Sequence, residues 1–100
     1  MSADRVGVPG TPYELEFQPL RQSLTDAPPM LWGFQVHVLE DGRLVGVKTC
    51  FVGRVGVQAR HPEALEGTVE DLVPALHELA LEKIRARLEA GEPGDEIVFA

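Results

Sequence analysis

Residues 32–51, WGFQVHVLEDGRLVGVKTCF, predict a β-hairpin, and this stretch decides the fold. Asp41-Gly42 at its centre readily adopts the positive φ angles of a two-residue type I′ turn, and apolar residues alternate on either side. Placing Glu40 opposite Arg43 fixes the register, because a slip by one residue would reverse every side chain. One face then carries the mainly apolar pairs Val38 with Val45, Val36 with Val47, Phe34 with Thr49 and Trp32 with Phe51. We expect this face to form the core.

The second face of the predicted hairpin is mixed in character. The same register gathers a candidate binding face of four side chains, Gln35, His37, Lys48 and Cys50, beside Gly33 and Gly46. Glycine leaves room for a shallow pocket, and Lys48 could stabilise a Cys50 thiolate there, so a small-molecule or catalytic site is one hypothesis. The alternative is a solvated sheet face in which Cys50 is a small buried residue.

The rest of the chain predicts two more strands and one helix. Residues 13–18 alternate between apolar and polar side chains, as a half-buried strand does, and residues 69–90 have helical periodicity. Residues 96–100 predict a short closing strand. Residues 1–12 are expected to be a flexible leader before a single domain that spans 13–100. The connection 19–30 exceeds the usual length of a loop, which is typical of mobile or functional segments.

Both ends of the predicted helix carry boundary signals. Thr68 with Asp71 three residues later resembles a capping box, and Gly91 followed by Pro93 ends the pattern. Pro74 leaves the start of the helix open. A helix capped by Thr68 would lose one hydrogen bond at Pro74, whereas a helix capped by Asp71 would not.

The second strand of the predicted hairpin is longer than the first. Apolar alternation continues from Val45 to Ala59, which favours one long strand bent near Gly53 or Gly56. A type II′ turn at Gly53-Arg54 into a further strand is the alternative. The part of this strand that extends beyond the first strand of the hairpin needs a partner. The predicted helix 69–90 also has apolar residues around a wide arc, and the outer part of that arc needs a partner as well. The resulting candidate interface comprises Arg54, Val55, Val57, Leu81 and Leu88.

Composition favours an ordinary globular domain with an acidic surface. The 100 residues are 44% hydrophobic and 25% charged, and the formal net charge is -7. An acidic surface repels phosphate backbones, so direct nucleic-acid binding is disfavoured and a basic protein partner is favoured. The single cysteine cannot form an internal disulfide, residues 1–10 lack the features of a signal peptide, and no apolar run is long enough to cross a membrane. We therefore expect a cytoplasmic protein.

The sequence lacks motifs for catalysis, metal binding or nucleotide binding. His37, His61 and His77 do not have the spacing of metal ligands, and the glycines do not form a phosphate-binding loop. No serine, histidine and aspartate pattern of a nucleophilic site is evident. We therefore expect no catalytic residue, no cofactor and no metal ion.

Two short motifs resemble a known family. Glu40-Asp41-Gly42 lies at a tight turn, and residues 67–72, GTVEDL, open the helix. With the order strand, strand, strand, helix, strand, these motifs resemble the HicB-like antitoxin family over about half of the chain. The resemblance implies a small βββαβ domain that binds a small basic toxin. The long connection 19–30 is extra to the family's pattern.

These patterns predict an α+β fold in which an antiparallel sheet of three to five strands carries one long helix on one face. The expected function is that of a small acidic interaction module without enzymatic activity, which forms a homodimer, binds a protein partner, or both. An antitoxin, and a small-molecule-binding or enzymatic domain, are the alternatives.

Overall fold

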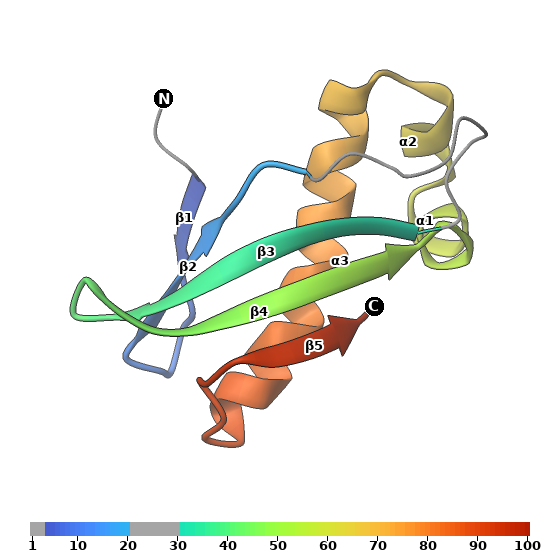
Figure 1. Cartoon of the computed structure of the whole chain (residues 1–100). Coiled ribbons are helices and arrows are strands. Elements are labelled where there is room, and N and C mark those ends of the chain that lie inside the picture. The colour runs from blue at the N-terminus through green and yellow to red at the C-terminus, as the bar shows by residue number, and fades with distance from the viewer. Residues whose placement is uncertain (1–3, 21–30) are drawn as a thin grey trace.

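The Asp41-Gly42 turn forms as the sequence predicts, and the sheet is built around it. In the computed structural model, which describes residues 4–20 and 31–100, the φ angles of Asp41 and Gly42 are 53° and 77°, as a type I′ turn requires. Five strands form one sheet in the order β1-β2-β3-β4-β5 (Figure 1). The elements are β1 (Asp4–Gly7), β2 (Tyr13–Phe17), β3 (Leu31–Glu40), β4 (Arg43–Gly53), α1 (Arg54–Arg60), α2 (Pro62–Glu66), α3 (Val69–Glu89) and β5 (Glu96–Phe99).

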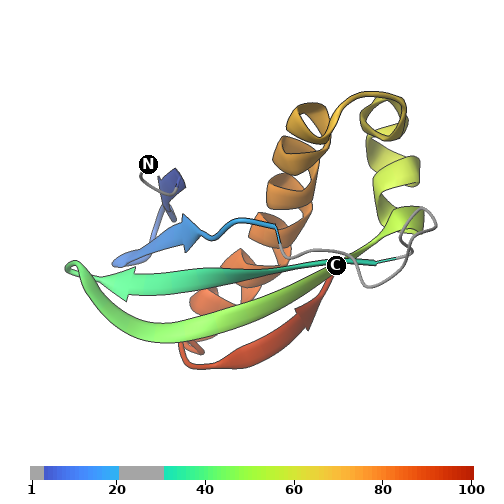
Figure 2. The ribbon, with the colours of Figure 1, turned by 45° about the horizontal axis from the view of Figure 1, so that its top comes forward.

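The α+β class and the long helix on one face of the sheet are confirmed, but the sheet is mixed rather than antiparallel. Strands β1 to β4 pair antiparallel in sequence order, whereas β5 lies parallel to β4. A parallel neighbour requires a crossover, which α1, α2 and α3 supply. The helices lie on one side of β3 and β4 (Figure 2). Among the described elements, none covers the other side, which we call the open face.

A β-bulge near the turn changes the register of the hairpin. Glu40 opposite Arg43 and Leu39 opposite Leu44 agree with the prediction, but the next residue of β3, Val38, lies opposite Gly46. Val45 is therefore an extra residue on β4, as in a β-bulge. Beyond it the predicted register is wrong by one residue, and the pairs are Val36 with Lys48, Phe34 with Cys50, Gly33 with Phe51 and Trp32 with Val52.

Gly46 supplies the physical reason for the shifted register. A Cβ atom on Gly46 would lie 2.0 Å from the Pro93 carbonyl oxygen and 2.8 Å from Gly94 Cα. The connection between α3 and β5 thus packs directly on the backbone of β4, which only glycine permits. Asp95 in this connection also accepts a hydrogen bond from the Val47 amide (2.8 Å). The bulge turns Gly46 toward this connection and moves Val47 to the open face.

The predicted leader contributes a strand to the sheet. Residues 4–7 form β1, which pairs with β2, and the adjacent Val8 is 3% exposed. The boundary predicted between residues 12 and 13 is therefore wrong, because part of the segment before it belongs to the domain. Most of the predicted connection 19–30 lies outside the described residues.

Strand β4 ends at Gly53, so the long bent strand is a wrong prediction, and so is the turn into a further strand. The next residues form α1 and α2 instead. Val57 on α1 is fully buried in the core, while Val55 is 74% exposed. Alternating valines fit a strand by local propensity, but the contacts that bury Val57 favour a helix here.

Helix α3 begins at the predicted residue and ends one residue short of the predicted boundary. Thr68 is its N-cap, and the Asp71 carboxylate accepts hydrogen bonds from the Thr68 amide (3.0 Å) and hydroxyl (3.3 Å). Pro74 therefore lies inside the helix. At the other end, Gly91 has a φ of 83° and its amide bonds the Leu88 carbonyl, so it provides the expected glycine stop.

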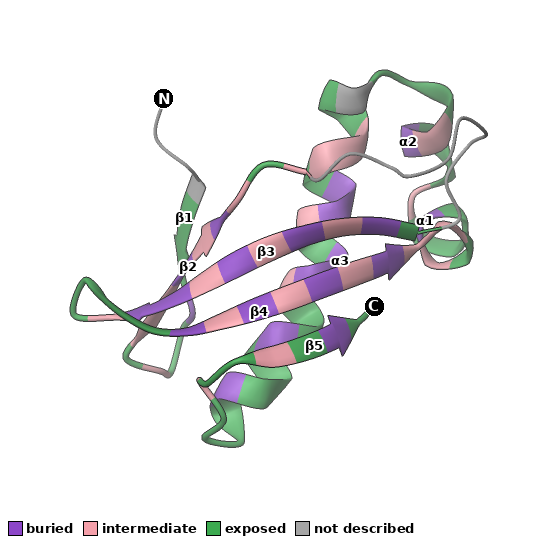
Figure 3. Cartoon of the chain, viewed as in Figure 1, coloured by how far each residue is buried: buried purple, intermediate pink, exposed green. Residues whose placement is uncertain are grey.

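The core lies between α3 and the covered face of the sheet. Figure 3 shows buried and partly exposed residues alternating along β3 and β4, as expected for strands with one covered face. The largest contributions come from Leu15, Phe17, Trp32, Phe34, Val36, Val38, Cys50 and Val52 on the sheet and from Leu76, Leu79, Ile84 and Leu88 on α3.

Candidate interaction surface

The open face carries four neighbouring apolar side chains at one end of the sheet. We call this set, Leu31, Phe51, Ile97 and Phe99, the apolar stripe. Leu31 is 50% exposed, Ile97 60% and Phe99 67%. The stripe crosses three adjacent strands, since Leu31 is on β3, Phe51 on β4 and the others on β5. The rings of Phe51 and Phe99 stack with their centroids 5.6 Å apart.

Gly33 lets the ring of Phe51 lie across β3. The two residues are cross-strand partners, and a Cβ atom on Gly33 would lie 3.2 Å from a carbon of the Phe51 ring. An aromatic ring that covers a strand glycine shields the backbone and fixes the ring. Phe51 is therefore held in place on both sides, by Gly33 and by Phe99, and the centre of the stripe is ordered before any partner binds.

A shallow cleft borders the stripe on the open face. It has a volume of about 460 Å³ and is lined by Gln35, Val47, Thr49, Asp95, Glu96 and Ile97. The lining combines apolar side chains with an amide and two carboxylates, and the cleft is open to solvent. Such a cleft suits a side chain of a partner protein better than an enclosed small molecule.

Charged residues at the other end of the open face neutralise one another. Arg5 Nε donates to Glu16 Oε2 at 2.9 Å, and His37 Nδ1 lies 3.7 Å from Glu16 Oε1. The hydrogen bond from Arg5 and a second one from Gln18 hold the pKa of Glu16 below its ordinary value. This end of the face therefore presents a compact ion pair on β1 and β2, away from the apolar stripe.

The four residues of the predicted binding face do not come together. Gln35 and His37 lie on the open face, but the bulge places Lys48 and Cys50 on the covered side, where they are 1% and 0% exposed. The geometric basis of the small-molecule or catalytic hypothesis is thus lost. The error came from the predicted register, which the bulge at Val45 shifts by one residue.

Among the residues that the structure describes, Lys48 is the charged residue whose side chain is buried. Its Nζ donates to the Glu92 carbonyl oxygen (2.7 Å) and to Glu96 Oε1 (2.9 Å). Glu96 Oε2 also lies 3.3 Å from Arg87 Nε. The hydrogen bond from Lys48, supported by the charges of Lys48 and Arg87, lowers the pKa of Glu96 against the opposing effect of desolvation. Lys48 therefore ties β4 to β5 and to the connection between α3 and β5, which is a structural role.

Cys50 is held in a state that disfavours nucleophilic chemistry. Burial raises the pKa of its thiol to about 12, although the Lys48 charge acts in the opposite direction. Its Sγ lies 4.0 Å from the Lys48 carbonyl oxygen. A thiol in this environment stays protonated at neutral pH and packs as a small apolar group.

We expect Cys50 to react with a thiol reagent at neutral pH roughly a thousandfold more slowly than an exposed cysteine, because its thiolate fraction is that much smaller. The measurement is the rate of labelling by an aromatic disulfide, with and without urea. Val55→Cys provides an exposed thiol as the control, since Val55 is 74% exposed. A native Cys50 that reacts as fast as this added thiol would contradict the prediction and reopen the catalytic hypothesis.

The residues of the predicted interface lie in different environments in the structure. Val57 and Leu88 are buried in the core, and Leu81 is partly buried against it. Val55 is exposed on α1, and Arg54 is half-buried at the first position of that helix. The set does not form one surface, because α1 replaces the predicted strand overhang and the sheet covers more of the arc of α3 than expected.

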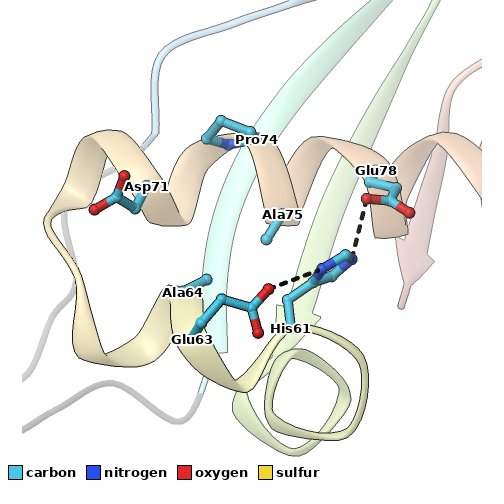
Figure 4. A pocket seen from close by; sticks show the side chains of 7 residues that line it. All are labelled: His61, Glu63, Ala64, Asp71, Pro74, Ala75 and Glu78. Carbon is cyan, nitrogen blue, oxygen red and sulfur yellow. Dashed lines mark ion pairs between the residues drawn. The ribbon is translucent and has the colours of Figure 1, made fainter.

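A second cleft, of about 460 Å³, lies between α2 and α3, and Figure 4 shows the side chains that line it. His61 Nε2 is 3.0 Å from Glu78 Oε2, although the two groups are not aligned as a hydrogen bond, and His61 Nδ1 is 3.7 Å from Glu63 Oε1. These pairs link the two helices. No group of three or more potential ligands in the described part of the chain could hold a metal ion.

The remaining histidine, His77, has a packing role. Its ring stacks on Phe17 with centroids 4.3 Å apart and contacts Phe34 at 5.6 Å. It therefore joins α3 to β2 and β3. The three histidines lie in three different environments, on the open face, at the α2 cleft and in the helix–sheet interface.

The apolar stripe was not among the residues selected from the sequence. Phe51 was assigned to the core by the predicted register, which lacks the bulge, and Ile97 and Phe99 were assigned only to a closing strand. One signal could have found it. Residues 97–99 are apolar at three successive positions, so at least one face of that strand must expose apolar side chains if the other is buried.

Comparison of the chain with family models, with curated proteins and with solved structures gives no match. Among the described residues, no helix has the length and apolar character needed to span a membrane. The interpretation of function therefore depends on the geometry of the molecule itself.

Proposed function

We propose that this protein is a non-enzymatic interaction module that binds protein partners through the apolar stripe of its open face. The observation that carries the proposal is the contiguity of Leu31, Phe51, Ile97 and Phe99 across three strands, with three of the four at least half exposed. Single exposed apolar residues are ordinary on protein surfaces, whereas a contiguous patch with a polar rim is typical of an interaction site.

The chemistry of the stripe supports this function. Aromatic side chains in a central, ordered position are the usual anchors of protein interfaces. The stacked Phe51 and Phe99 rings provide such an anchor, and their mutual contact reduces the conformational entropy that binding must remove. The adjoining shallow cleft supplies polar groups beside it, from Gln35, Asp95 and Glu96.

The distribution of charge also supports a protein partner on the open face. Half of the acidic side chains lie in residues 62–92, which form α2, α3 and the start of the connection to β5. The helices are on the covered side of the sheet (Figure 2), so much of the negative charge lies away from the stripe. A partner can approach the open face without crossing the most acidic surface.

Replacing one residue of the stripe by a charge tests the proposal. Leu31→Asp is expected to weaken association of the protein, with itself or with a captured partner, by about tenfold or more, because a charge would be desolvated in the interface. Val55→Asp is the matched control, since Val55 is 74% exposed on α1, outside the stripe. Sedimentation velocity measures self-association, and affinity capture followed by titration measures heterologous binding.

Equal behaviour of wild type, Leu31→Asp and Val55→Asp in both measurements would contradict the proposed function. Circular dichroism of each variant shows whether the fold is retained. Both substitutions replace exposed side chains, so we expect the free energy of unfolding to change little.

A further inference from the structure

The outer edge of β5 presents unpaired backbone groups. The Ala100 amide donates to the Phe51 carbonyl (2.9 Å), and the Gly53 amide donates to the Ala100 carbonyl (3.1 Å). In a parallel ladder, alternate residues bond to the same neighbour, so Glu96, Val98 and Ala100 point their amides and carbonyls toward β4. The amides and carbonyls of Ile97 and Phe99 therefore point away from β4. No described strand pairs with them, because β5 is the last strand of the sheet.

The middle and end of this short edge strand leave it open to pairing, because its one charged side chain, Glu96, is paired with Lys48 and Arg87 of the same chain. Residues 96–99 contain no lysine, no proline and no bulge, and two of the four side chains are large, apolar and exposed. The opposite edge of the sheet, β1, carries the charged Arg5. An unprotected, apolar edge strand is a template for pairing with another chain.

We propose that β5 pairs with β5 of a second copy of this chain, antiparallel and with the two-fold axis at Val98. This inference depends on the proposed function, because it names a second copy of the chain as the partner that binds Ile97 and Phe99 of the apolar stripe. In this register Ile97 lies opposite Phe99 of the second copy. Both residues have outward backbone groups, so each such pair forms two hydrogen bonds, and the symmetric arrangement forms both pairs.

The side chains at this junction are complementary. Ile97 and Phe99 both lie on the open face, so each pair brings a β-branched side chain beside an aromatic ring, a favourable cross-strand combination. The two sheets become continuous, and the stripes of the two copies meet at the axis. The paired stripe is then one larger apolar surface.

Charge complementarity favours a second copy as the occupant of the edge. Antiparallel pairing brings the beginning of β5 in one copy to the end of β5 in the other. The exposed Asp95 precedes the strand, while Arg54 follows the Gly53 amide that bonds Ala100 at the strand's end. Arg54 has no ion pair among the described residues. Asp95 Oδ1 accepts a hydrogen bond from the Val47 amide of its own copy, which leaves the second oxygen of the carboxylate for Arg54 of the other copy. The symmetric arrangement forms this contact twice.

Two substitutions at one position test the edge. Ile97→Pro removes an outward amide that makes no bond to β4, so the sheet can accommodate it at an edge. Ile97→Thr removes a similar amount of apolar surface but retains the amide. Light scattering during size-exclusion chromatography is expected to show a dimer for wild type and Ile97→Thr. For Ile97→Pro we expect association about 30-fold weaker, because each copy loses one interface donor.

Cysteine cross-linking tests the register. Residues 97 and 99 of different copies would have Cα atoms about 5.5 Å apart, within the range of a disulfide. Two copies of residue 97 would be offset by roughly 6.8 Å along the strand, which is too far. A mixture of Ile97→Cys and Phe99→Cys is therefore expected to form the mixed disulfide in preference to either homodimer. Cys50 does not interfere, since its thiol is buried.

Three results would overturn the inference: a monomeric wild type at high concentration, a dimer that Ile97→Pro leaves intact, or homodisulfides that form as readily as the mixed one. Each result leaves the proposed function to be judged by Leu31→Asp, which lies on β3 away from the edge. Loss of binding in Leu31→Asp with no effect of Ile97→Pro means that the open face binds but β5 does not pair.

Discussion

Gly46→Ala is expected to lower the free energy of unfolding by about 3 kcal/mol, one of the two largest effects of a single substitution in this chain. The added Cβ would lie within 3 Å of three backbone atoms of Pro93 and Gly94. Backbone cannot move aside as the end of a side chain can, so the connection between α3 and β5 must shift. That shift would strain the Asp95 hydrogen bond to Val47 and the pairing of β5 with β4.

Gly94→Ala is the matched control for Gly46→Ala. It adds the same methyl group to the other side of the same contact, where no heavy atom lies within 4 Å of the new Cβ and φ is not positive. We expect a change of at most about 0.5 kcal/mol. Urea unfolding followed by the fluorescence of Trp32, which is buried, measures both variants. Equal stabilities of the two would show that the contact on Gly46 does not determine the position of β5.

Lys48→Ala is the second substitution for which we expect a large loss, also about 3 kcal/mol. It removes a fully buried aliphatic stem and leaves the Glu92 carbonyl without its donor. Lys48→Met retains the stem and should cost only about 1 kcal/mol, because an apolar isostere often replaces a buried charge at little cost. Lys83→Ala, at an exposed position of α3, is the control and should change stability by at most about 0.5 kcal/mol.

The difference in the free energy of unfolding between wild type and Lys48→Met is expected to become smaller at acidic pH. Because Lys48 lowers the pKa of Glu96 in the folded state, the ion pair contributes fully above the ordinary value of 4.5. The contribution is lost as the pH falls through the lower, folded value. Urea unfolding at neutral pH and below pH 4.5 measures this change. A Lys48→Ala variant as stable as Lys83→Ala, or a difference that does not depend on pH, would contradict the structural role assigned to Lys48.

Local signals predicted several elements correctly because each depends on residues close in sequence. The Asp41-Gly42 turn requires only two residues with positive φ, and the alternation of residues 13–18 extends over one strand. Helix α3 has its capping residues, its apolar periodicity and its glycine stop within one segment. For these elements, neighbouring residues contain the whole physical cause.

The candidate site could not be predicted in the same way. Its position depends on which face of β4 is covered, and the bulge at Val45 reverses that face. The sequence alternation Val45, Val47, Thr49 and Phe51 favoured the opposite choice. Lys48 can be buried on the covered side, together with Cys50, only because folding brings Glu92 and Glu96 next to it.

The sequence by itself determined the turn, the long helix with its cap, the closing strand and the α+β class, since these follow from backbone preference and short-range periodicity. Tertiary structure decided the bulge, the conversion of residues 54–60 from a predicted strand into α1, and the parallel docking of β5. The physical reason is steric and electrostatic contact between distant segments. The α3–β5 connection fits against β4 only at Gly46, and Lys48 needs the oxygen atoms that this connection and β5 bring to it. Those contacts leave the apolar stripe on the open face.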